Sequence, residues 1–271
     1  MDSMLRFHSI LYKEKIIKYC DEISNDCRRI GAVNTIVKNA EGKYIGYNTD
    51  YFGFRYLLEK SDIDVAGRKC VILGSGGASK TVSVVLQDLG AKEILVVSRT
   101  GKINYENIKE YSDAEIIVNS TPVGMFPNNM RSLINLDDFP GCIGVVDLIY
   151  NPNRTKLILD AMERGIPAVS GLGMLVAQGF KASELFQGKE LDSEEISIAI
   201  EEIRDATLNK ILIGMPGAGK TFLGMKMAEA TGREFVDIDD EIEADEGMSV
   251  AQIFEEKGEA YFRKLETEKL R

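Results

Sequence analysis

The chain has 271 residues, of which 44% are hydrophobic and 28% charged, and its formal net charge is -10. The length suggests about two domains, and an acidic chain without a cluster of Lys or Arg is disfavoured as a binder of nucleic acid or anionic membranes. No apolar run approaches the ~20 residues of a membrane span, so we expect no signal peptide, no transmembrane helix and a cytoplasmic location.

Residues 1–60 are predicted to form a small α/β unit. The apolar spacing over residues 13–24 predicts a short helix. Two strand-like runs follow at 32–37 and 43–48, with a turn between them. A second amphipathic helix is predicted to start near Asp50.

From residue 61 the predicted strands are apolar throughout, as in a parallel sheet that is covered on both faces. They are 70–73, 94–97, 115–118 and 144–149. Helical segments lie between most of them, which predicts an α/β fold with a doubly wound, Rossmann-type parallel sheet over 61–170. Residues 171–207 are predicted to be closing helices and a linker.

Residues 208–271 are predicted to begin a second nucleotide-binding domain. A strand at 211–213, a Gly-rich turn, a helix and a second strand at 234–239 follow one another, and the final residues have a helical pattern. We expect this P-loop α/β domain to be incomplete.

The cysteines and the single histidine do not suggest a metal site or a redox pair. Cys20, Cys27, Cys70 and Cys142 lack the close spacings of zinc sites or redox pairs, so we interpret them as buried thiols. The single His8 cannot form a metal cluster. Any catalysis must therefore depend on Lys, Asp, Tyr, backbone amides and bound cofactors.

The segment after the strand at 70–73 has the pattern of a dinucleotide-binding turn. Glycine permits a tight bend and close approach of a pyrophosphate, which the N-terminus of the next helix attracts. The predicted cofactor-binding residues are Gly74, Ser75, Gly76, Gly77, Ala78 and Ser79. The alternative is a Gly-rich connection without a ligand.

Cofactor choice is usually read at the end of the following strand. Cations and hydroxyls there suit a 2′-phosphate, because Arg can pair with it bidentately and Lys adds a point charge. We therefore predict NADP rather than NAD; the alternative is a solvated basic turn. The predicted contacts are Ser98, Arg99, Thr100 and Lys102.

The segment Gly214-Met-Pro-Gly-Ala-Gly-Lys-Thr fits the P-loop pattern at every position. It predicts ATP and Mg²⁺ binding, with Lys220 bridging phosphates and Thr221 holding the metal. The amides predicted to cradle phosphate are those of Gly217, Ala218, Gly219 and Lys220. Asp237 and Asp239 end the next predicted strand with their carboxylates on one side, one for the metal and one for a substrate hydroxyl.

Six motifs, in order over about residues 10–205, resemble shikimate dehydrogenase. They are Ile30-Gly-Ala-Val-Asn-Thr-Ile-Val, Gly46-Tyr-Asn-Thr-Asp, Gly74-Ser-Gly-Gly-Ala-Ser, Asn119-Ser-Thr-Pro-Val-Gly-Met, Asp147-Leu-Ile-Tyr-Asn-Pro and Gly171-Leu-Gly-Met-Leu-Val-Ala-Gln. The resemblance implies NADPH-dependent reduction of 3-dehydroshikimate to shikimate in aromatic amino-acid biosynthesis. It makes residues 1–60 a partial substrate-binding domain.

From residue 209 the chain is similar to the start of shikimate kinase. The motifs are Gly214-Met-Pro-Gly-Ala-Gly-Lys-Thr, Phe235-Val-Asp-Ile-Asp, Gly247-Met-Ser-Val-Ala-Gln-Ile-Phe and Gly258-Glu-Ala-Tyr-Phe-Arg. This resemblance implies a fusion to an incomplete ATP-dependent kinase. It places Asp239 and Arg263 at the shikimate hydroxyls and carboxylate, and Asp237 near Mg²⁺.

The dehydrogenase resemblance also implies site residues. Lys13 and Asp50 take the places of the catalytic pair that exchanges the proton of the reacting hydroxyl. Without the resemblance, Lys13 would be interpreted as a surface lysine and Asp50 as a helix cap. The implied substrate contacts are Asn34, Gln178 and Tyr150, and the implied contacts on the nicotinamide side are Thr121, Gly171 and Met174.

Departures from both families lead to further expectations. Only about a dozen residues precede Lys13, so the substrate-binding serines of the first half-domain are missing, and residues 1–9 are expected not to be native family sequence. The kinase lid is missing too, so we expect no kinase activity. Two alternatives stay open: a nucleotide-binding remnant without turnover, and a quinate/shikimate dehydrogenase that uses NAD.

Overall fold

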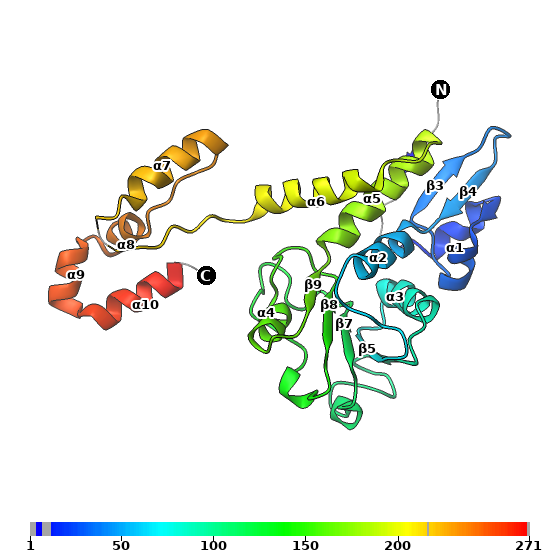
Figure 1. Ribbon diagram of the computed structural model, residues 1–271, viewed down its shortest axis with the longest axis horizontal. Coiled ribbons are helices and arrows are strands. Elements are labelled where there is room, and N and C mark those ends of the chain that lie inside the picture. Colours follow the sequence, from blue (N-terminus) through cyan, green and yellow to red (C-terminus); the bar gives the residue numbers. More distant parts are fainter. Residues whose placement is uncertain (1–3, 7–11, 216, 270–271) are drawn as a thin grey trace. The chain divides into compact units, whose positions relative to one another are not determined.

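The computed structural model describes residues 4–6, 12–215 and 217–269. The chain divides into two compact units, Met1–Thr207 and Leu208–Arg271 (Figure 1). Of the first nine residues only 4–6 are described, and they form a strand. The expectation that residues 1–9 are not native family sequence falls largely outside the described residues.

The first unit begins with a four-stranded sheet of order β1-β3-β4-β2. Its strands are β1 Met4–Arg6, β2 Glu22–Ile23, β3 Thr35–Lys38 and β4 Tyr44–Tyr47. β3 runs antiparallel to both β1 and β4, whereas β2 is parallel to β4. Gly46 is required in β4 because a Cβ there would lie 2.9 Å from the Val33 side chain.

The single helix predicted over 13–24 is wrong. The segment instead forms a 3-10 helix, η1 (Lys15–Tyr19), and then β2, before helix α1 (Asn25–Ile30) begins. Ser24 adopts extended backbone and caps α1, its Oγ accepting a hydrogen bond from the Cys27 amide at 3.3 Å. Pairing of β2 with β4 and this cap together outweigh the helical spacing of the apolar residues.

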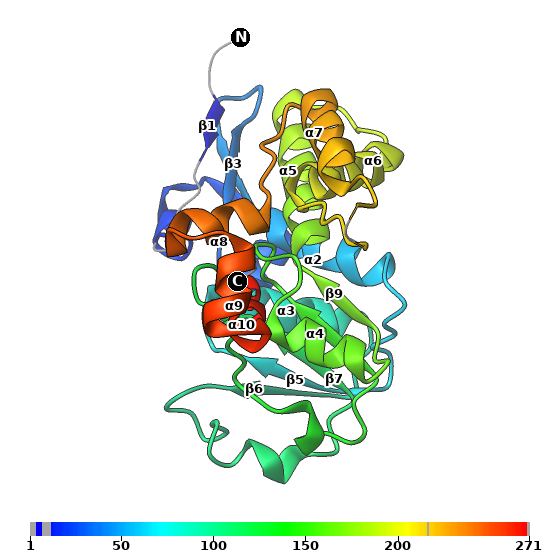
Figure 2. The same cartoon turned by 90° about the vertical axis from the view of Figure 1, so that its left-hand side faces the viewer.

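A five-stranded parallel sheet forms the centre of the first unit. Its strands are β5 Lys69–Leu73, β6 Glu93–Val97, β7 Ile116–Asn119, β8 Gly144–Asp147 and β9 Ala168–Ser170. Their order is β6-β5-β7-β8-β9, and Figure 2 shows β5, β6 and β7 side by side. The predicted Rossmann-type sheet is confirmed. Because β6 is added on one side of β5 and β7 on the other, the strand order reverses between β5 and β7, and a crevice for ligands is expected at their carboxyl ends.

Helices cover both faces of this sheet, as Figure 1 shows for α3 and α4. The longer helices are α2 Thr49–Glu59, α3 Gly77–Asp88, α4 Lys156–Glu163, α5 Leu172–Gln187 and α6 Ser193–Thr207, and the short ones are η2 Ile108–Tyr111 and η3 Leu136–Asp138. One apolar core lies under α2, α3 and α5, and a second lies under α4, η2 and η3.

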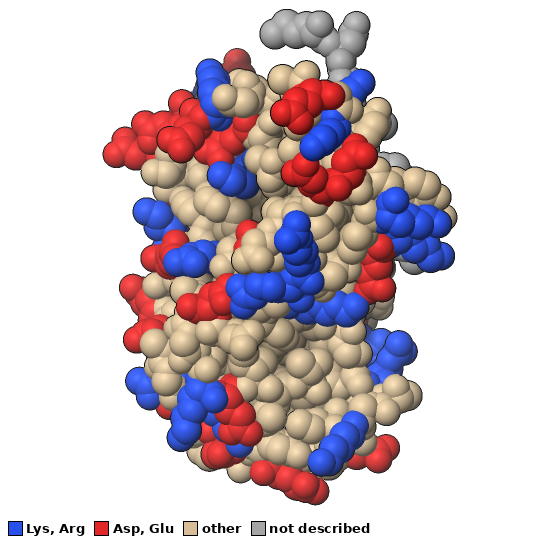
Figure 3. Space-filling view, turned by 90° about the vertical axis from the view of Figure 1, so that its right-hand side faces the viewer, with Lys and Arg blue, Asp and Glu red and all other residues tan. Residues whose placement is uncertain are grey.

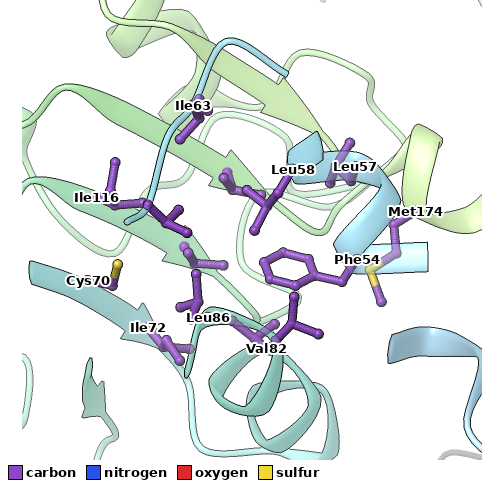
Figure 4. Packing of buried hydrophobic residues seen from close by; sticks show 14 residues of the cluster. Phe54, Leu57, Leu58, Ile63, Cys70, Ile72, Val82, Leu86, Ile116 and Met174 are labelled. Atoms are coloured by element: carbon purple, nitrogen blue, oxygen red, sulfur yellow. The ribbon is translucent and has the colours of Figure 1, made fainter. Parts of the chain in front are cut away.

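Phe54 lies at the centre of the first core (Figure 4). This fully buried ring projects from α2 toward Val82 of α3, and Met174 of α5 belongs to the same core. Burying a side chain of this size contributes about 1.5–3 kcal/mol. Helix α2 is therefore held in place by packing, which matters because its first turn carries Asp50.

The second unit is helical in its described part. Its helices are α7 Lys220–Thr231, α8 Ile238–Glu246, α9 Val250–Lys257 and α10 Glu259–Lys269. Helices α8, α9 and α10 share a core of Ile242, Ile253 and Phe262.

The strands predicted at 211–213 and 234–239 are absent from the described part of this unit. A parallel strand needs a neighbouring strand for its backbone groups, yet Ile213 is 89% exposed. Asp237 instead caps α8, its carboxylate accepting a hydrogen bond from the Asp239 amide at 3.1 Å. The Asp-x-Asp sequence is therefore the start of a helix, which carboxylates favour.

No helix in the described residues is both long and apolar enough to cross a bilayer. On the face shown in Figure 3, acidic and basic side chains are interspersed among uncharged ones. All four cysteines are free, and three of them, Cys27, Cys70 and Cys142, are buried.

Candidate functional site

An ion pair joins Lys13 and Asp50, which are 37 positions apart in the sequence. The Lys13 Nζ lies 2.6 Å from Asp50 Oδ2. The Lys13 carbonyl accepts a hydrogen bond from the Val33 amide at 2.8 Å, which holds Lys13 beside the start of β3. Asn48 caps α2, so Asp50 lies in the first turn, where the helix dipole favours its charge.

Asn34 places an unused hydrogen-bond donor beside this pair. Its Oδ1 accepts hydrogen bonds from the Thr49 amide at 2.9 Å and from the Thr35 hydroxyl at 3.1 Å. The side chain is only 3% exposed, and its Nδ2 has no partner among the described residues. Asn34 is bonded to Thr49, and Thr49 directly precedes Asp50, so Asn34 lies near the Lys13–Asp50 ion pair. An unpaired buried donor is costly, and a ligand acceptor would relieve that cost.

Helix α5 brings two more predicted residues against α2. A Cβ at Gly53 would lie 2.5 Å from the Met174 carbonyl and 3.1 Å from the Gln178 Cβ, so only glycine permits this approach. Gln178 is half-buried next to α2. Met174 is buried in the core, so most of its side chain packs against protein.

Gly171 lets the start of α5 pack against the segment after β8. Its amide donates a hydrogen bond to the Ile149 carbonyl at 3.0 Å, and a Cβ would lie 2.0 Å from the Leu148 carbonyl oxygen. Tyr150, which follows Ile149, is 50% exposed. Its ring is therefore accessible to a ligand at this edge of the sheet.

The predicted dinucleotide turn follows β5 at the point where the strand order reverses. Gly74 has a φ of +102°, and a Cβ there would lie 2.6 Å from the Thr121 Cγ2, so glycine is required for two reasons. No side chain caps α3 at Gly76, and a Cβ on Gly76 or Gly77 would meet nothing within 4 Å. The start of α3 therefore has no side-chain cap and has free space beside Gly76 and Gly77, as a phosphate site requires.

The other residues of the turn support this arrangement. Ser79 is buried, and its Oγ donates a hydrogen bond to the Gly76 carbonyl at 2.6 Å, which fixes the start of α3. Ser75 is exposed and Ala78 half-buried.

A tight basic turn follows β6. The Ser98 amide donates a hydrogen bond to the Ile103 carbonyl at 3.1 Å. Arg99, Thr100 and Lys102 are exposed. In the described parts of the chain, no carboxylate forms an ion pair with Arg99 or Lys102. Both cations are therefore available to an anionic ligand.

Thr121 is oriented by a buried network that sequence reasoning missed. The Asn119 Oδ1 accepts hydrogen bonds from the Thr121 hydroxyl at 2.7 Å and from the Thr121 amide at 3.0 Å. The Asn119 Nδ2 in turn donates to Asp147 Oδ1 at 3.0 Å. Burial raises the pKa of Asp147, which is completely inaccessible. Both residues begin motifs that resemble shikimate dehydrogenase and end neighbouring apolar strands, but these signals did not show that the two side chains bond each other.

Sequence comparison identifies the family to which this fold and site belong. The chain is 35% identical over 209 residues to a shikimate dehydrogenase (NADP(+)) from Clostridium perfringens, a match that covers 72% of the chain and 77% of the relative. The chain belongs to the shikimate dehydrogenase family.

Solved structures share its architecture. A chorismate mutase/shikimate 5-dehydrogenase fusion protein from Clostridium acetobutylicum is 35% identical with a TM-score of 0.69, covering 73% of this chain and 76% of that one. The shikimate 5-dehydrogenase from Thermus thermophilus, solved with NADP(H) and shikimate, is 30% identical with a TM-score of 0.62, covering 72% and 77%.

In this member of the shikimate dehydrogenase family, the second unit carries the predicted P-loop. Gly219 precedes α7 with a φ of +81° and no side-chain cap. The Lys220 Nζ donates to the Gly214 carbonyl at 2.8 Å, and the Thr221 hydroxyl donates to Asp237 Oδ2 at 3.2 Å. The structure thus brings Lys220, Thr221 and Asp237 together. Gly217 and Ala218 are exposed in the same loop.

The two residues predicted to hold shikimate in this unit are not paired with each other. Arg263 forms ion pairs with Glu259 at 3.1 Å and with Glu266 at 2.8 Å. Burial and the neighbouring charge of Asp237 raise the pKa of Asp239.

The described residues of the shikimate dehydrogenase family member contain no group of three or more His, Cys, Asp or Glu that could bind a metal. A P-loop site does not need such a group. Mg²⁺ has few protein ligands there, because phosphate oxygens supply further ligands. The shikimate kinase family model matches residues 216–271.

Proposed function

We propose that the chain catalyses the NADPH-dependent reduction of 3-dehydroshikimate to shikimate in aromatic amino-acid biosynthesis, and the reverse oxidation. The observation that carries this proposal is the 2.6 Å pair of Lys13 and Asp50 next to the unpaired Nδ2 of Asn34. A proton-transfer pair beside a free buried donor fits a polyhydroxylated substrate with one reacting carbonyl. Membership of the shikimate dehydrogenase family supports the same reaction.

Bound NADPH would supply the hydride to the carbonyl carbon. The Lys13 ammonium holds a proton at the carbonyl oxygen and delivers it as that oxygen becomes a hydroxyl. Asp50 holds the Lys13 Nζ in position and balances its charge. In the oxidation, neutral Lys13 takes the proton back from the hydroxyl.

The substrate would be oriented by donors on three elements. Asn34 precedes β3 and offers its Nδ2, Gln178 on α5 offers its amide, and Tyr150 after β8 offers its hydroxyl. Asn34 and Gln178 both lie against α2, through Thr49 and Gly53 respectively. Holding the reacting carbon in this way lowers the entropic cost of the transfer.

The cofactor would occupy the crevice at β5 and β7. The uncapped start of α3 suits the pyrophosphate, and the available Arg99 and Lys102 suit a 2′-phosphate. Thr121 and Gly171 would line the nicotinamide end. The relative from Clostridium perfringens, named for NADP(+), and the solved relative with NADP(H) and shikimate support NADP.

Shikimate oxidation by the purified chain, followed as NADPH formation, tests the proposal. We expect Lys13→Ala to lower kcat by about 10²- to 10⁴-fold, the usual contribution of a general acid or base. The matched control is Lys15→Ala, because Lys15 is an exposed neighbour in η1 and should leave the rate unchanged. Equal rates for parent and Lys13→Ala would remove Lys13 from the mechanism, and an inactive parent would refute the function.

For the second unit we infer that the P-loop binds ATP with Mg²⁺. The Lys220 Nζ is held only by two backbone carbonyls, which phosphate oxygens can replace, and Thr221 with Asp237 would meet the metal. Calorimetric titration with Mg·ATP should show one site in the parent and none in Lys220→Ala. The control Lys226→Ala, in the same helix, should bind normally. Assaying ADP formation with and without shikimate then tests for phosphoryl transfer.

A further inference from the structure

The buried carboxylate of Asp147 connects the two loops that flank the proposed nicotinamide end. Its Oδ1 accepts hydrogen bonds from the Asn119 Nδ2 and the Ile149 amide, each at 3.0 Å. Its Oδ2 accepts one from the Thr155 hydroxyl at 2.7 Å. The carboxylate is fully buried, and all three of these partners are neutral.

The contacts at Oδ1 decide how Asn119 is oriented. The Asn119 Nδ2 donates to Asp147 Oδ1 at 3.0 Å and more weakly to the Val123 carbonyl at 3.3 Å, so the Asn119 Oδ1 faces the other way, toward the amide and hydroxyl of Thr121. Through Asn119, Asp147 therefore fixes the Thr121 side chain, which packs against Gly74 of the dinucleotide turn.

The same oxygen also holds the other loop. The Ile149 amide bonds Oδ1, and the Ile149 carbonyl accepts a hydrogen bond from the Gly171 amide at 3.0 Å. Tyr150 follows directly. One carboxylate oxygen therefore positions both the loop after β7 and the loop after β8.

We propose that Asp147 is a positioning residue that preorganises the nicotinamide half of the cofactor site, a role that rests on the function proposed above. It touches neither substrate nor cofactor. Its carboxylate fixes Thr121 through Asn119 and Tyr150 through Ile149, so it acts on the nicotinamide end and has no contact with the 2′-phosphate end at Arg99 and Lys102.

The contact at Oδ2 has a different role and supplies a matched control. Thr155 caps α4, its Oγ accepting a hydrogen bond from the Ile158 amide at 3.4 Å. Removing this hydroxyl weakens α4 and one contact of Asp147, but it leaves both Oδ1 contacts in place. A purely structural role predicts that Thr155 and Asp147 variants behave alike.

The experiment compares two ligands on the full-length chain. NADPH carries nicotinamide, whereas 2′-phosphoadenosine 5′-diphosphoribose is the same molecule without it. In Asp147→Ala we expect the Kd of NADPH to rise about tenfold and that of the analogue to stay within about twofold, since the hydrogen bonds lost organise only one end. The fluorescence of bound NADPH should also change.

Three further variants complete the test. Thr155→Val should bind both ligands as the parent does, although its thermal unfolding temperature falls. Asp147→Asn should restore part of the NADPH affinity, because its amide keeps one acceptor oxygen. Should Asp147→Ala not fold, Asn119→Ala interrupts the same connection and should reproduce the NADPH-specific loss.

Equal weakening of both ligands, or no weakening of either, in Asp147→Ala or Asn119→Ala would overturn the positioning role. A parent chain that binds both ligands but does not oxidise shikimate would refute the proposed reaction and leave this comparison valid. A parent that binds neither ligand would overturn the cofactor assignment and the positioning role together.

Discussion

Asn34 shows how a single buried side chain can be held ready for a ligand. Its oxygen is saturated by Thr35 and Thr49, which prevents the amide from flipping and keeps Nδ2 pointed away from these partners. An ordinary buried amide satisfies its donor within the protein. The fold here accepts the cost of an unpaired donor, which is a mark of a binding site rather than of a core.

Arg99 carries the proposed preference between NADP and NAD. Replacing it by Ala should raise the KM for NADP⁺ about tenfold or more, because a charge-assisted contact with the 2′-phosphate is lost. The KM for NAD⁺, which lacks that phosphate, should hardly change. Initial rates with both cofactors measure this in one variant, so each cofactor controls for the other. A parallel rise for both would show that Arg99 only supports the turn.

Some of these residues could be predicted from local spacing and others could not. The turn at Gly74 and Gly76 can be found because its backbone demands act on consecutive residues. Lys13 and Asp50 are far apart in sequence, and only resemblance to a family suggested pairing them. Asp147 was part of a quoted motif but received no role, because nothing in a strand-ending Asp reveals which donors the fold will bring to it.

At the scale of elements, three helices of the first unit meet at Asp88. Arg29 of α1 donates two hydrogen bonds to its carboxylate, at 2.6 and 2.7 Å, and the Tyr51 hydroxyl of α2 donates a third at 2.8 Å. Asp88 ends α3, where the helix dipole disfavours a negative charge. Arg29 compensates for this, and the cluster joins helices from the substrate and cofactor halves of the proposed site.

This cluster predicts how stability depends on pH. The Arg29 hydrogen bonds hold the pKa of Asp88 below its usual value of 3.8. A carboxyl with a lowered folded-state pKa stabilises the protein above its unfolded pKa, and this contribution is lost as the pH falls through the folded value. Asp88→Asn should therefore be less stable than the parent near pH 7, and the difference should shrink toward about pH 3.

Urea unfolding of the parent and of Asp88→Asn near pH 7 and about pH 3 measures this difference in stability. The exposed Asp62 provides the control, since Asp62→Asn should give a small difference at both. A gap between parent and Asp88→Asn that stays constant with pH would show that the ion pair contributes nothing.

Element types were predictable where packing follows sequence period. Strands β5 to β8 contain continuous apolar runs, so they were found with small errors at their ends. Segments 13–24 and 234–239 failed for a common reason. Each contains a helix cap, Ser24 or Asp237, whose local hydrogen bond decides the structure more strongly than apolar spacing does.

For the whole molecule, the division after Thr207 has a measurable consequence. Residues 209–215 have no regular structure, and Lys210 is exposed among them. Brief digestion with trypsin should cut first after Lys210, because proteases need an accessible and deformable segment. Mass spectrometry of the products identifies the site. First cuts inside the five-stranded sheet would contradict the division.

Helix α2 carries both Asp50, in its first turn, and Phe54, at the centre of the core. The two side chains are one helical turn apart, so any repacking around Phe54 displaces Asp50 as well. In a mutational library, substitutions around Phe54 should therefore lose turnover before they lose solubility. Selection for catalysis would then act on the interior of this protein more stringently than selection for folding.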